Sequence, residues 1–204
     1  MPREGIDGIT TADVAFAAEL HHVIKLLAVA EDEGGRLTVR VYPAMIPLTH
    51  PLAAVRHAFN AVFIEGEDVG RVMFYGRGAG GGPTGSAVLG DLIDASVNLS
   101  KGTHASIGKL TKFRRLPDSA LESAFYLNIE VTDQAGVLAA VATVFARHDV
   151  SIESMEQSGL GGNARIIFIT HETNESDMKR CLAELRRLKS VRRIVSTLRV
   201  IEDH

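Results

Sequence analysis

Residues 74–91 read FYGRGAGGGPTGSAVLGD, and six of the first fifteen residues in this stretch are glycines. Residues 70–75 are predicted to form a short strand, and Pro83 is predicted to be the first residue of a helix. Glycines between a strand and a helix allow a sharp turn and a close approach by another molecule. The amide groups and the dipole at the start of the helix also favour negative charge. We therefore predict either a tight structural turn or a contact for an anion or a cofactor.

The helix after this turn is expected to bury five apolar side chains, those of Ala87, Val88, Leu89, Leu92 and Ile93. Gly76, Gly78 and Gly81 satisfy the spacing G-x-G-x-x-G of dinucleotide-binding folds. Those folds also need a second strand that ends in an acidic residue about twenty positions later. Residues 100–115 instead read SKGTHASIGKLTKFRR, which is polar and basic. This part of the sequence thus predicts a single contact to a cofactor held elsewhere, rather than a complete nucleotide-binding fold.

The composition is that of a globular protein. Its 204 residues are 46% hydrophobic, which is enough for one large or two small cores. The formal net charge of −3 offers no general attraction for nucleic acid or an anionic membrane. No apolar run has the roughly 18 residues of a membrane span, and residues 1–13 lack the charge pattern of a secretory signal. The single cysteine, Cys181, excludes an internal disulfide and is expected to be a buried thiol, so we predict a cytoplasmic protein.

Residues 1–99 are predicted to form an α+β domain with an antiparallel or mixed sheet and helices on one face. Thr10 or Thr11 is expected to cap the first helix, which ends at His21 and His22. Adjacent histidines point to different sides, so no metal site is expected there. Prolines at positions 43, 47 and 51 are expected to interrupt regular structure. Four strands in two hairpins are expected at residues 23–31, 36–42, 61–65 and 70–75.

Residues 100–123 are predicted to be a linker, because they lack apolar periodicity and carry five basic side chains. Residues 124–204 then follow the order strand, helix, strand, strand, helix, strand, with Asp133 expected to cap the first of these helices. This βαββαβ order is the ferredoxin-like arrangement, in which two helices cover one face of a sheet. The other face is expected to need a partner, such as a second copy of the chain.

Five blocks of residues together resemble the C-terminal half of homoserine dehydrogenase. They are GIDGITTAD, VIKLLA, VYPAMIPLTHPLA, AFNAV and FYGRGAGGGPTGSAV. Residues from 125 onward resemble an ACT domain, a module that binds a regulatory amino acid in related enzymes. Their DQAGVL segment matches the usual D-x-P-G-V-L loop, with Ala135 in place of the commoner proline. The resemblance implies the C-terminal part of the catalytic domain in residues 1–99, a linker in 100–123 and an ACT regulatory domain in 124–204.

The resemblance also implies a function in threonine and methionine biosynthesis. Homoserine dehydrogenase interconverts L-homoserine and L-aspartate 4-semialdehyde with NADP or NAD, and the ACT domain implies feedback control by L-threonine or another amino acid. The family's Rossmann domain and catalytic lysine have no match in these residues, so no catalytic residue is assigned. Hydride transfer needs cofactor and substrate held in reactive geometry, so these residues alone are expected to be inactive.

Two other functions remain open. The first is a non-catalytic regulatory subunit that senses an amino acid and docks on an enzyme. The second is a stand-alone nucleotide binder built on the glycine turn. A Rossmann domain encoded just upstream would favour the enzyme, whereas a complete homoserine dehydrogenase encoded elsewhere would favour the sensor.

The resemblance assigns a cofactor contact and an effector site. The cofactor contact is placed at Gly78, Ala79 and Gly80. His50 is expected to have a structural hydrogen-bonding role in its proline-braced turn. The effector site is placed at a loop and helix start formed by Asp133, Ala135, Gly136, Val137 and Leu138. A neighbouring copy in a homo-oligomer could complete this site with Glu153, Met155 and Gln157, although a solvent-facing strand also accounts for these residues.

Overall fold

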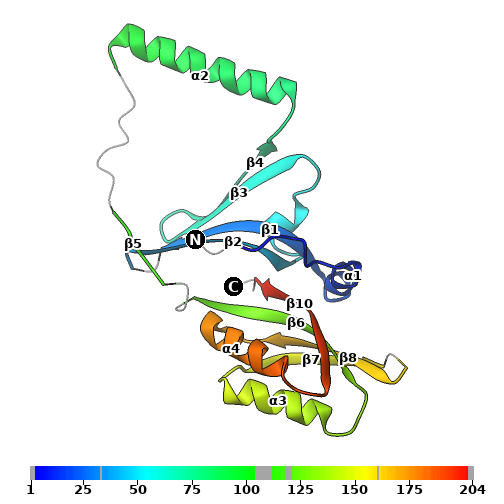
Figure 1. Ribbon diagram of the computed structural model, residues 1–204. Coiled ribbons are helices and arrows are strands. Elements are labelled where there is room, and N and C mark those ends of the chain that lie inside the picture. The colour runs from blue at the N-terminus through cyan, green and yellow to red at the C-terminus, as the bar shows by residue number, and fades with distance from the viewer. Residues whose placement is uncertain (1–2, 33, 104–111, 118–120, 160, 202–204) are drawn as a thin grey trace. The chain divides into compact units, whose positions relative to one another are not determined.

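A computed structural model describes residues 3–32, 34–103, 112–117, 121–159 and 161–201 (Figure 1). The chain divides into two compact units. The first comprises Met1–Thr49 and Phe113–His204, and the second comprises His50–Lys112. The division at residues 99 and 124 rests on sequence resemblance instead, and it stays a prediction.

One mixed sheet organises the first unit. Its strands are β1 (His22–Asp32), β2 (Arg36–Pro47), β6 (Glu122–Thr132), β7 (Ile152–Gly159), β8 (Asn163–Thr170) and β10 (Val191–Val200), with the short strands β5 (Arg114–Arg115) and β9 (Thr173–Asn174) beside β2 and β6. The hydrogen-bonded order is β1-β2-β10-β6-β8-β7. β1 and β2 form the predicted antiparallel hairpin, whereas β2 and β10 are parallel and meet at Ala44 and Met45. Strands from both ends of the sequence therefore share one sheet.

The ferredoxin-like order predicted for the C-terminal region is confirmed as β6, α3 (Val137–Arg147), β7, β8, α4 (Glu175–Leu185) and β10. Helices α3 and α4 lie on the same face of the sheet (Figure 1). Alternate residues of β6 face these helices and join one apolar core, namely Phe125, Leu127, Ile129 and Val131. Cys181 is buried in this core, and burial raises the pKa of its thiol to about 12. The thiol is therefore protonated and poorly reactive at neutral pH.

Helix α1 (Thr11–Glu19) covers part of the opposite face of the same sheet. Thr10 caps this helix as predicted, in a capping box that Asp13 completes. The rings of Phe16 in α1 and Tyr126 in β6 lie 5.7 Å apart. A second apolar cluster forms here, whose buried members are Ala17, Met45, Ala124, Tyr126, Ile167, Leu198 and Val200. The expectation that this face needs a partner is thus met in part by the chain itself.

The expectation that prolines interrupt regular structure is wrong for Pro43, because β2 continues through it, whereas β2 does end at Pro47. Pro43 lies opposite Leu26 of β1, and the parallel pairing with β10 begins at Ala44. A proline has no amide hydrogen to donate, but Pro43 lies just before the ladder with β10 begins, where no β10 residue is paired with it. Burial of the neighbouring Ala44, Met45 and Ile46 keeps the strand extended.

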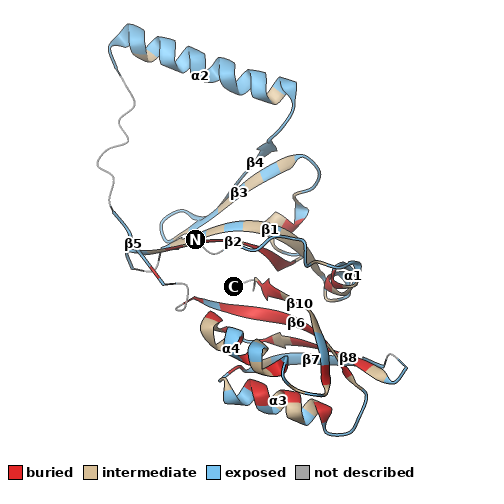
Figure 2. Cartoon of the chain, in the orientation of Figure 1, coloured by how far each residue is buried: buried red, intermediate tan, exposed pale blue. Residues whose placement is uncertain are grey.

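The second unit contains the 3-10 helix η1 (Pro51–Ala54), the hairpin of β3 (Phe59–Gly66) and β4 (Gly70–Arg77), and helix α2 (Gly81–Lys101). The hairpin is confirmed, but it forms a two-stranded sheet of its own rather than joining β1 and β2. Helix α2 begins at Gly81, so Pro83 is not its first residue. Its expected buried face is wrong as well. The exposed residues of α2 include Ala87, Val88, Leu89, Leu92 and Ile93 (Figure 2).

The exposure of α2 has a simple cause. Its apolar residues follow the helical period, but no described residue of the second unit packs over them. In the described residues, no helix combines the length and the apolar character needed to cross a membrane.

Candidate functional site

The glycine-rich turn (residues 76–82) joins β4 to α2. Gly80 is the N-cap of α2, and its φ of 122° strains any residue that carries a side chain. At Gly78, an added Cβ would overlap the side-chain amide of Asn60. No side chain caps the start of α2, which leaves amide groups for another partner. The predicted contact residues Gly78, Ala79 and Gly80 are adjacent and exposed in this turn, and their binding of a cofactor stays a prediction.

His50 lies in the second unit as the N-cap of η1. Its Nδ1 accepts a hydrogen bond of 3.1 Å from the backbone amide of Leu52. Its ring also lies against Phe63, with ring centroids 4.9 Å apart. These contacts are those of a residue that shapes the backbone, which agrees with the structural role predicted for His50.

The predicted effector loop lies between β6 and α3. Asp133 does not cap the helix as expected, because α3 begins after Gly136, which has a φ of 85° and provides no side-chain cap. The backbone amide of Asp133 instead donates to the carbonyl oxygen of Gly162 at 3.4 Å. Asp133, Ala135 and Gly136 are exposed, whereas the side chains of Val137 and Leu138 pack into the apolar core. A ligand here would meet the Asp133 carboxylate and backbone groups, and that role stays a prediction.

Sequence reasoning missed a buried ion network in the first unit. Arg199 of β10 donates from Nε to Glu175 Oε1 at 2.5 Å and from Nη2 to Glu175 Oε2 at 2.8 Å. The same guanidinium binds both carboxylate oxygens of Glu4 at 2.8 and 3.0 Å. Burial lowers the pKa of Arg199, but hydrogen bonds and charges from Glu175 and Glu4 outweigh this and raise it above its ordinary value. Arg199 is therefore a permanently charged link between the start of α4 and the N-terminal segment.

A second guanidinium, that of Arg40 on β2, extends the network. Its Nη2 binds Glu31 Oε2 at 2.9 Å, and its Nη1 lies 3.8 Å from Glu175 Oε1. The ring of Tyr42 lies near both cations, 5.3 Å from Arg40 and 4.6 Å from Arg199. Burial raises the pKa of Tyr42, so its phenol is neutral at physiological pH. The network joins strands β1 and β2 to α4 and β10.

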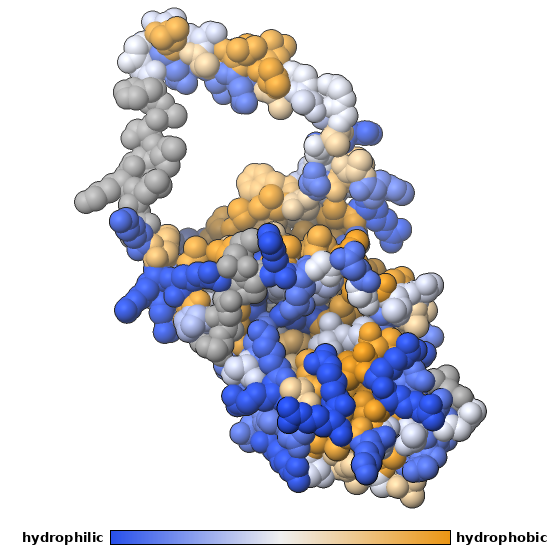
Figure 3. All heavy atoms as spheres, viewed as in Figure 1, coloured by the Kyte–Doolittle hydropathy of each residue, from blue (hydrophilic) through white to orange (hydrophobic). Residues whose placement is uncertain are grey.

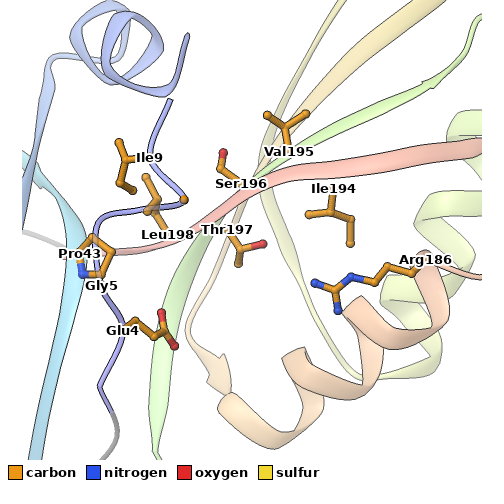
Figure 4. Close-up of a pocket in the computed structure, with 11 residues that line it drawn as sticks. Glu4, Gly5, Ile9, Pro43, Arg186, Ile194, Val195, Ser196, Thr197 and Leu198 are labelled. Carbon is orange, nitrogen blue, oxygen red and sulfur yellow. The ribbon is translucent and has the colours of Figure 1, made fainter. Parts of the chain in front are cut away.

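A hollow of about 280 Å³ lies beside this network, between the N-terminal segment, β10 and the C-terminal end of α4 (Figure 4). The guanidinium of Arg186 points into it from one side, and Glu4 lies on the other side (Figure 4). The carboxylate of Glu4 is already held by Arg199. Among the described residues that line the hollow, Arg186 is thus a cation available to a ligand, whereas the carboxylate of Glu4 is already paired.

Asp13 is a second buried charged group that sequence reasoning missed. The sequence placed it in the first helix but predicted no buried contact for it. Its carboxylate accepts hydrogen bonds from the backbone amide of Thr10 at 2.8 Å, from Asn128 Nδ2 at 3.3 Å and from the hydroxyl of Ser196. Burial raises the pKa of Asp13, but these hydrogen bonds together lower it below its ordinary value. Asp13 therefore fastens α1 to β6 and β10 as a charged acceptor. Among the described residues, no cluster of His, Cys, Asp and Glu is suited to hold a metal.

Two family models match the chain in order. Residues 1–93 match the homoserine dehydrogenase family and residues 125–190 match the ACT domain. Homoserine dehydrogenase from Mycobacterium tuberculosis is 43% identical over 97% of this chain, and that from Corynebacterium glutamicum is 40% identical over 98%. The chain spans about half the length of these relatives, 48% and 46% respectively.

Solved structures agree with this match. The crystal structure of a homoserine dehydrogenase from Thiobacillus denitrificans has a TM-score of 0.89 and 33% identity over 98% of this chain and 47% of its own. That of the S. aureus enzyme at pH 6.0 has a TM-score of 0.64 and 25% identity over the same shares. The glycine-rich turn lies inside the first matched region and the effector loop inside the second. By sequence and by fold, the chain therefore belongs to the homoserine dehydrogenase family and corresponds to its ACT-containing C-terminal half.

Proposed function

We propose that the chain is the C-terminal part of an NAD(P)-dependent homoserine dehydrogenase, which interconverts L-homoserine and L-aspartate 4-semialdehyde. The observation that best supports this is the 43% identity to the Mycobacterium tuberculosis enzyme over 97% of the chain. Residues 1–99 supply the end of the substrate and dimerisation domain, residues 100–123 the linker and residues 124–204 the ACT domain. The enzyme acts as a homo-oligomer in the cytoplasm, in keeping with the free, buried Cys181.

The glycine-rich turn contributes the cofactor contact in this proposal. The oxidised cofactor would accept a hydride from L-homoserine, and the reduced cofactor would supply one to L-aspartate 4-semialdehyde. Backbone groups of Gly78, Ala79 and Gly80 would hold NADP or NAD in place. The left-handed backbone of Gly80 and the absence of a side-chain cap on α2 support this, because both leave the backbone accessible.

These 204 residues are expected to be inactive on their own and active when combined with the rest of the enzyme. The exposed apolar face of α2 supports a contact with further polypeptide, since Val88, Leu89 and Leu92 are 54%, 58% and 60% exposed (Figure 3). Purified chain should not reduce NADP with homoserine. Addition of a family fragment that carries the Rossmann domain and the catalytic lysine should restore the reaction. Oxidation of homoserine by the chain alone would refute this division of labour.

A matched pair of variants tests whether α2 provides that contact. Leu92→Glu places a charge on the apolar face and should prevent restoration of activity. Asp94→Ala, at an exposed position on the same helix, should leave restoration intact. Equal restoration with both variants would show that α2 is not the contact.

The ACT domain is expected to bind L-threonine or another amino acid at the loop of Asp133, Ala135 and Gly136. A ligand that binds the folded state stabilises it by about 2.7 kcal/mol at one hundred times its Kd. Millimolar L-threonine, tried beside other amino acids, should therefore raise the Tm of the chain. Asp133→Asn should reduce this shift, and Asp149→Asn, at the other end of α3, should not. No shift with any amino acid would contradict effector binding.

A non-catalytic amino-acid-sensing subunit is the second candidate. It is favoured by the core that α3 and α4 form on one face of the sheet, because these two helices bury the apolar residues of that face without further polypeptide. Failure of the Rossmann fragment to restore activity, together with a Tm shift by an amino acid, would favour the sensor over the enzyme. A heat of binding with NADP and the chain alone would instead support a stand-alone nucleotide binder.

A further inference from the structure

A groove lies between α1 and the part of the sheet that α1 does not cover. Its floor is made by β7 and β8, whose residues on this face pair as Ser154 with Ile169, Glu156 with Ile167 and Ser158 with Arg165. Two hollows, of about 300 and 160 Å³, adjoin here and share the side chains of Phe16, Glu156 and Ile167. The larger hollow is at the lower end of the size range of small-molecule sites, about 300 to 1,000 Å³.

The larger hollow contains charged groups of both signs. Arg165 contributes a guanidinium, while Glu156 of β7 and Glu19 at the end of α1 contribute carboxylates. The Nε atom of Arg165 is buried and has no hydrogen-bond partner among the described residues. No hydrogen bond or ion pair within the described residues occupies the guanidinium of Arg165, so a ligand in the hollow that supplies an acceptor would be favoured.

The smaller hollow is apolar on most sides. It continues the groove along α1 and is lined by Phe16, Leu20, Met155, Ile167 and Ile169, with Ser154 and Glu156. It can accommodate an aliphatic group of a ligand. Because no cationic side chain lines it, it is unsuited to a carboxylate. The two hollows together therefore present a charged end and an apolar end.

We propose that this groove binds an amino acid with an aliphatic side chain. The ligand carboxylate binds the guanidinium of Arg165, and the ligand ammonium lies between Glu156 and Glu19. The aliphatic side chain then occupies the smaller hollow against Phe16 and Ile167. A simple anion would face two carboxylates against one guanidinium, and a simple amine would leave Arg165 without an acceptor, so a zwitterion fits best.

This site is distinct from the effector loop. The loop lies at the start of α3, on the helical face of the sheet, whereas the groove lies on the face that α1 covers in part. A ligand in the groove touches α1, within the part that matches homoserine dehydrogenase, and β7 and β8, within the part that matches the ACT domain. Its binding therefore stabilises the attachment of one part to the other. The groove and the proposed effector loop have only the ligand class, an amino acid, in common.

Calorimetric titration of the full chain with L-isoleucine and L-leucine tests the proposal. Arg165→Gln and Glu156→Gln should each weaken binding about tenfold or more, because each removes a charged contact. Analogues without the ammonium or without the carboxylate, 3-methylpentanoate and 2-methylbutylamine, should bind as weakly. Arg193→Gln removes an exposed arginine from β10 that lines neither hollow, so it should leave the affinity unchanged.

A steric pair keeps the test independent of the buried charges. Ala15 of α1 lines the larger hollow, so Ala15→Leu should fill it and abolish binding. Ala18 is exposed on the same helix and does not line either hollow, so Ala18→Leu should bind normally. Binding that survives both Arg165→Gln and Ala15→Leu would overturn the proposal. If it is instead lost in Asp133→Asn, the ligand is in the effector loop, and the loop site stands while the groove site fails. No heat with L-isoleucine or L-leucine would overturn the groove site, while a shift in Tm by threonine would still support the loop.

Discussion

Replacement of Arg199 by alanine is expected to lower the free energy of unfolding by about 3–5 kcal/mol, because it breaks a buried ion network from its centre. Arg199 is 6% exposed and binds Glu175, which is 4% exposed. Without the guanidinium, the carboxylate of Glu175 loses its two shortest hydrogen bonds, and Arg40 at 3.8 Å is too distant to replace them. The Glu4 carboxylate is released as well, so the N-terminal segment loses its attachment to β10.

Arg193→Ala provides a matched control, because Arg193 lies on the same strand and pairs with Glu130 at 2.8 Å with its side chain 68% exposed. An exposed pair contributes about 0–1 kcal/mol, so this variant should resemble the unmodified chain. Urea denaturation followed by circular dichroism would measure both. Equal losses in the two variants would show that the Arg199 network adds no more than an exposed ion pair.

Replacement of Asp13 by alanine is expected to cost roughly 2–4 kcal/mol, since it removes both a helix cap partner and a buried acceptor. The side-chain amide of Asn128 and the hydroxyl of Ser196 would lose the oxygen to which they donate. The capping box with Thr10 would lose its reciprocal bond. Thermal or urea unfolding measures the loss. A variant as stable as the unmodified chain would show that water or a rearranged side chain replaces the carboxylate.

The depressed pKa of Asp13 also sets the sign of a pH dependence. Because the pKa in the folded state is lower than its ordinary value of 3.8, the carboxylate stabilises the fold above that value. This stability is lost as the pH falls below 3.8 toward the folded pKa. Asp13→Asn should therefore be less stable than the unmodified chain at pH 7, and the difference should shrink on acidification. A difference that does not change with pH would contradict the assignment of the charged form.

The two halves of the fold differ in how far local sequence predicts them. Period-two alternation in β6 and helical spacing in α4 are local patterns, and the predicted ferredoxin-like order follows them. The position of the glycine-rich turn was also predictable from local sequence, because Gly80 has a positive φ that residues with a side chain rarely adopt. For α2 the same kind of pattern predicted the helix but not the burial of its apolar face. An apolar face does not specify which part of a protein packs against it.

The candidate sites show the same limit. Asp133 sits where a cap is expected, yet α3 starts later because Gly136 adopts a left-handed backbone that begins the helix instead. Arg199 lies in the run VRRIVSTLRV beside other arginines, and only its partners distinguish it from the exposed Arg193. A buried cation is recognised by carboxylates that lie far away in sequence, and no local window contains them.

The sequence by itself determined the longer strands and helices, the glycine-rich turn and the family, because these depend on local periodicity, backbone preference and matched motifs. Only the tertiary structure decided that β2 pairs with β10 at Ala44 and Met45, that α1 covers part of one face of the sheet, and that Arg199 and Asp13 are buried. The physical reason is that these features depend on contacts between residues distant in sequence, whose burial is favourable only when both partners are already in place.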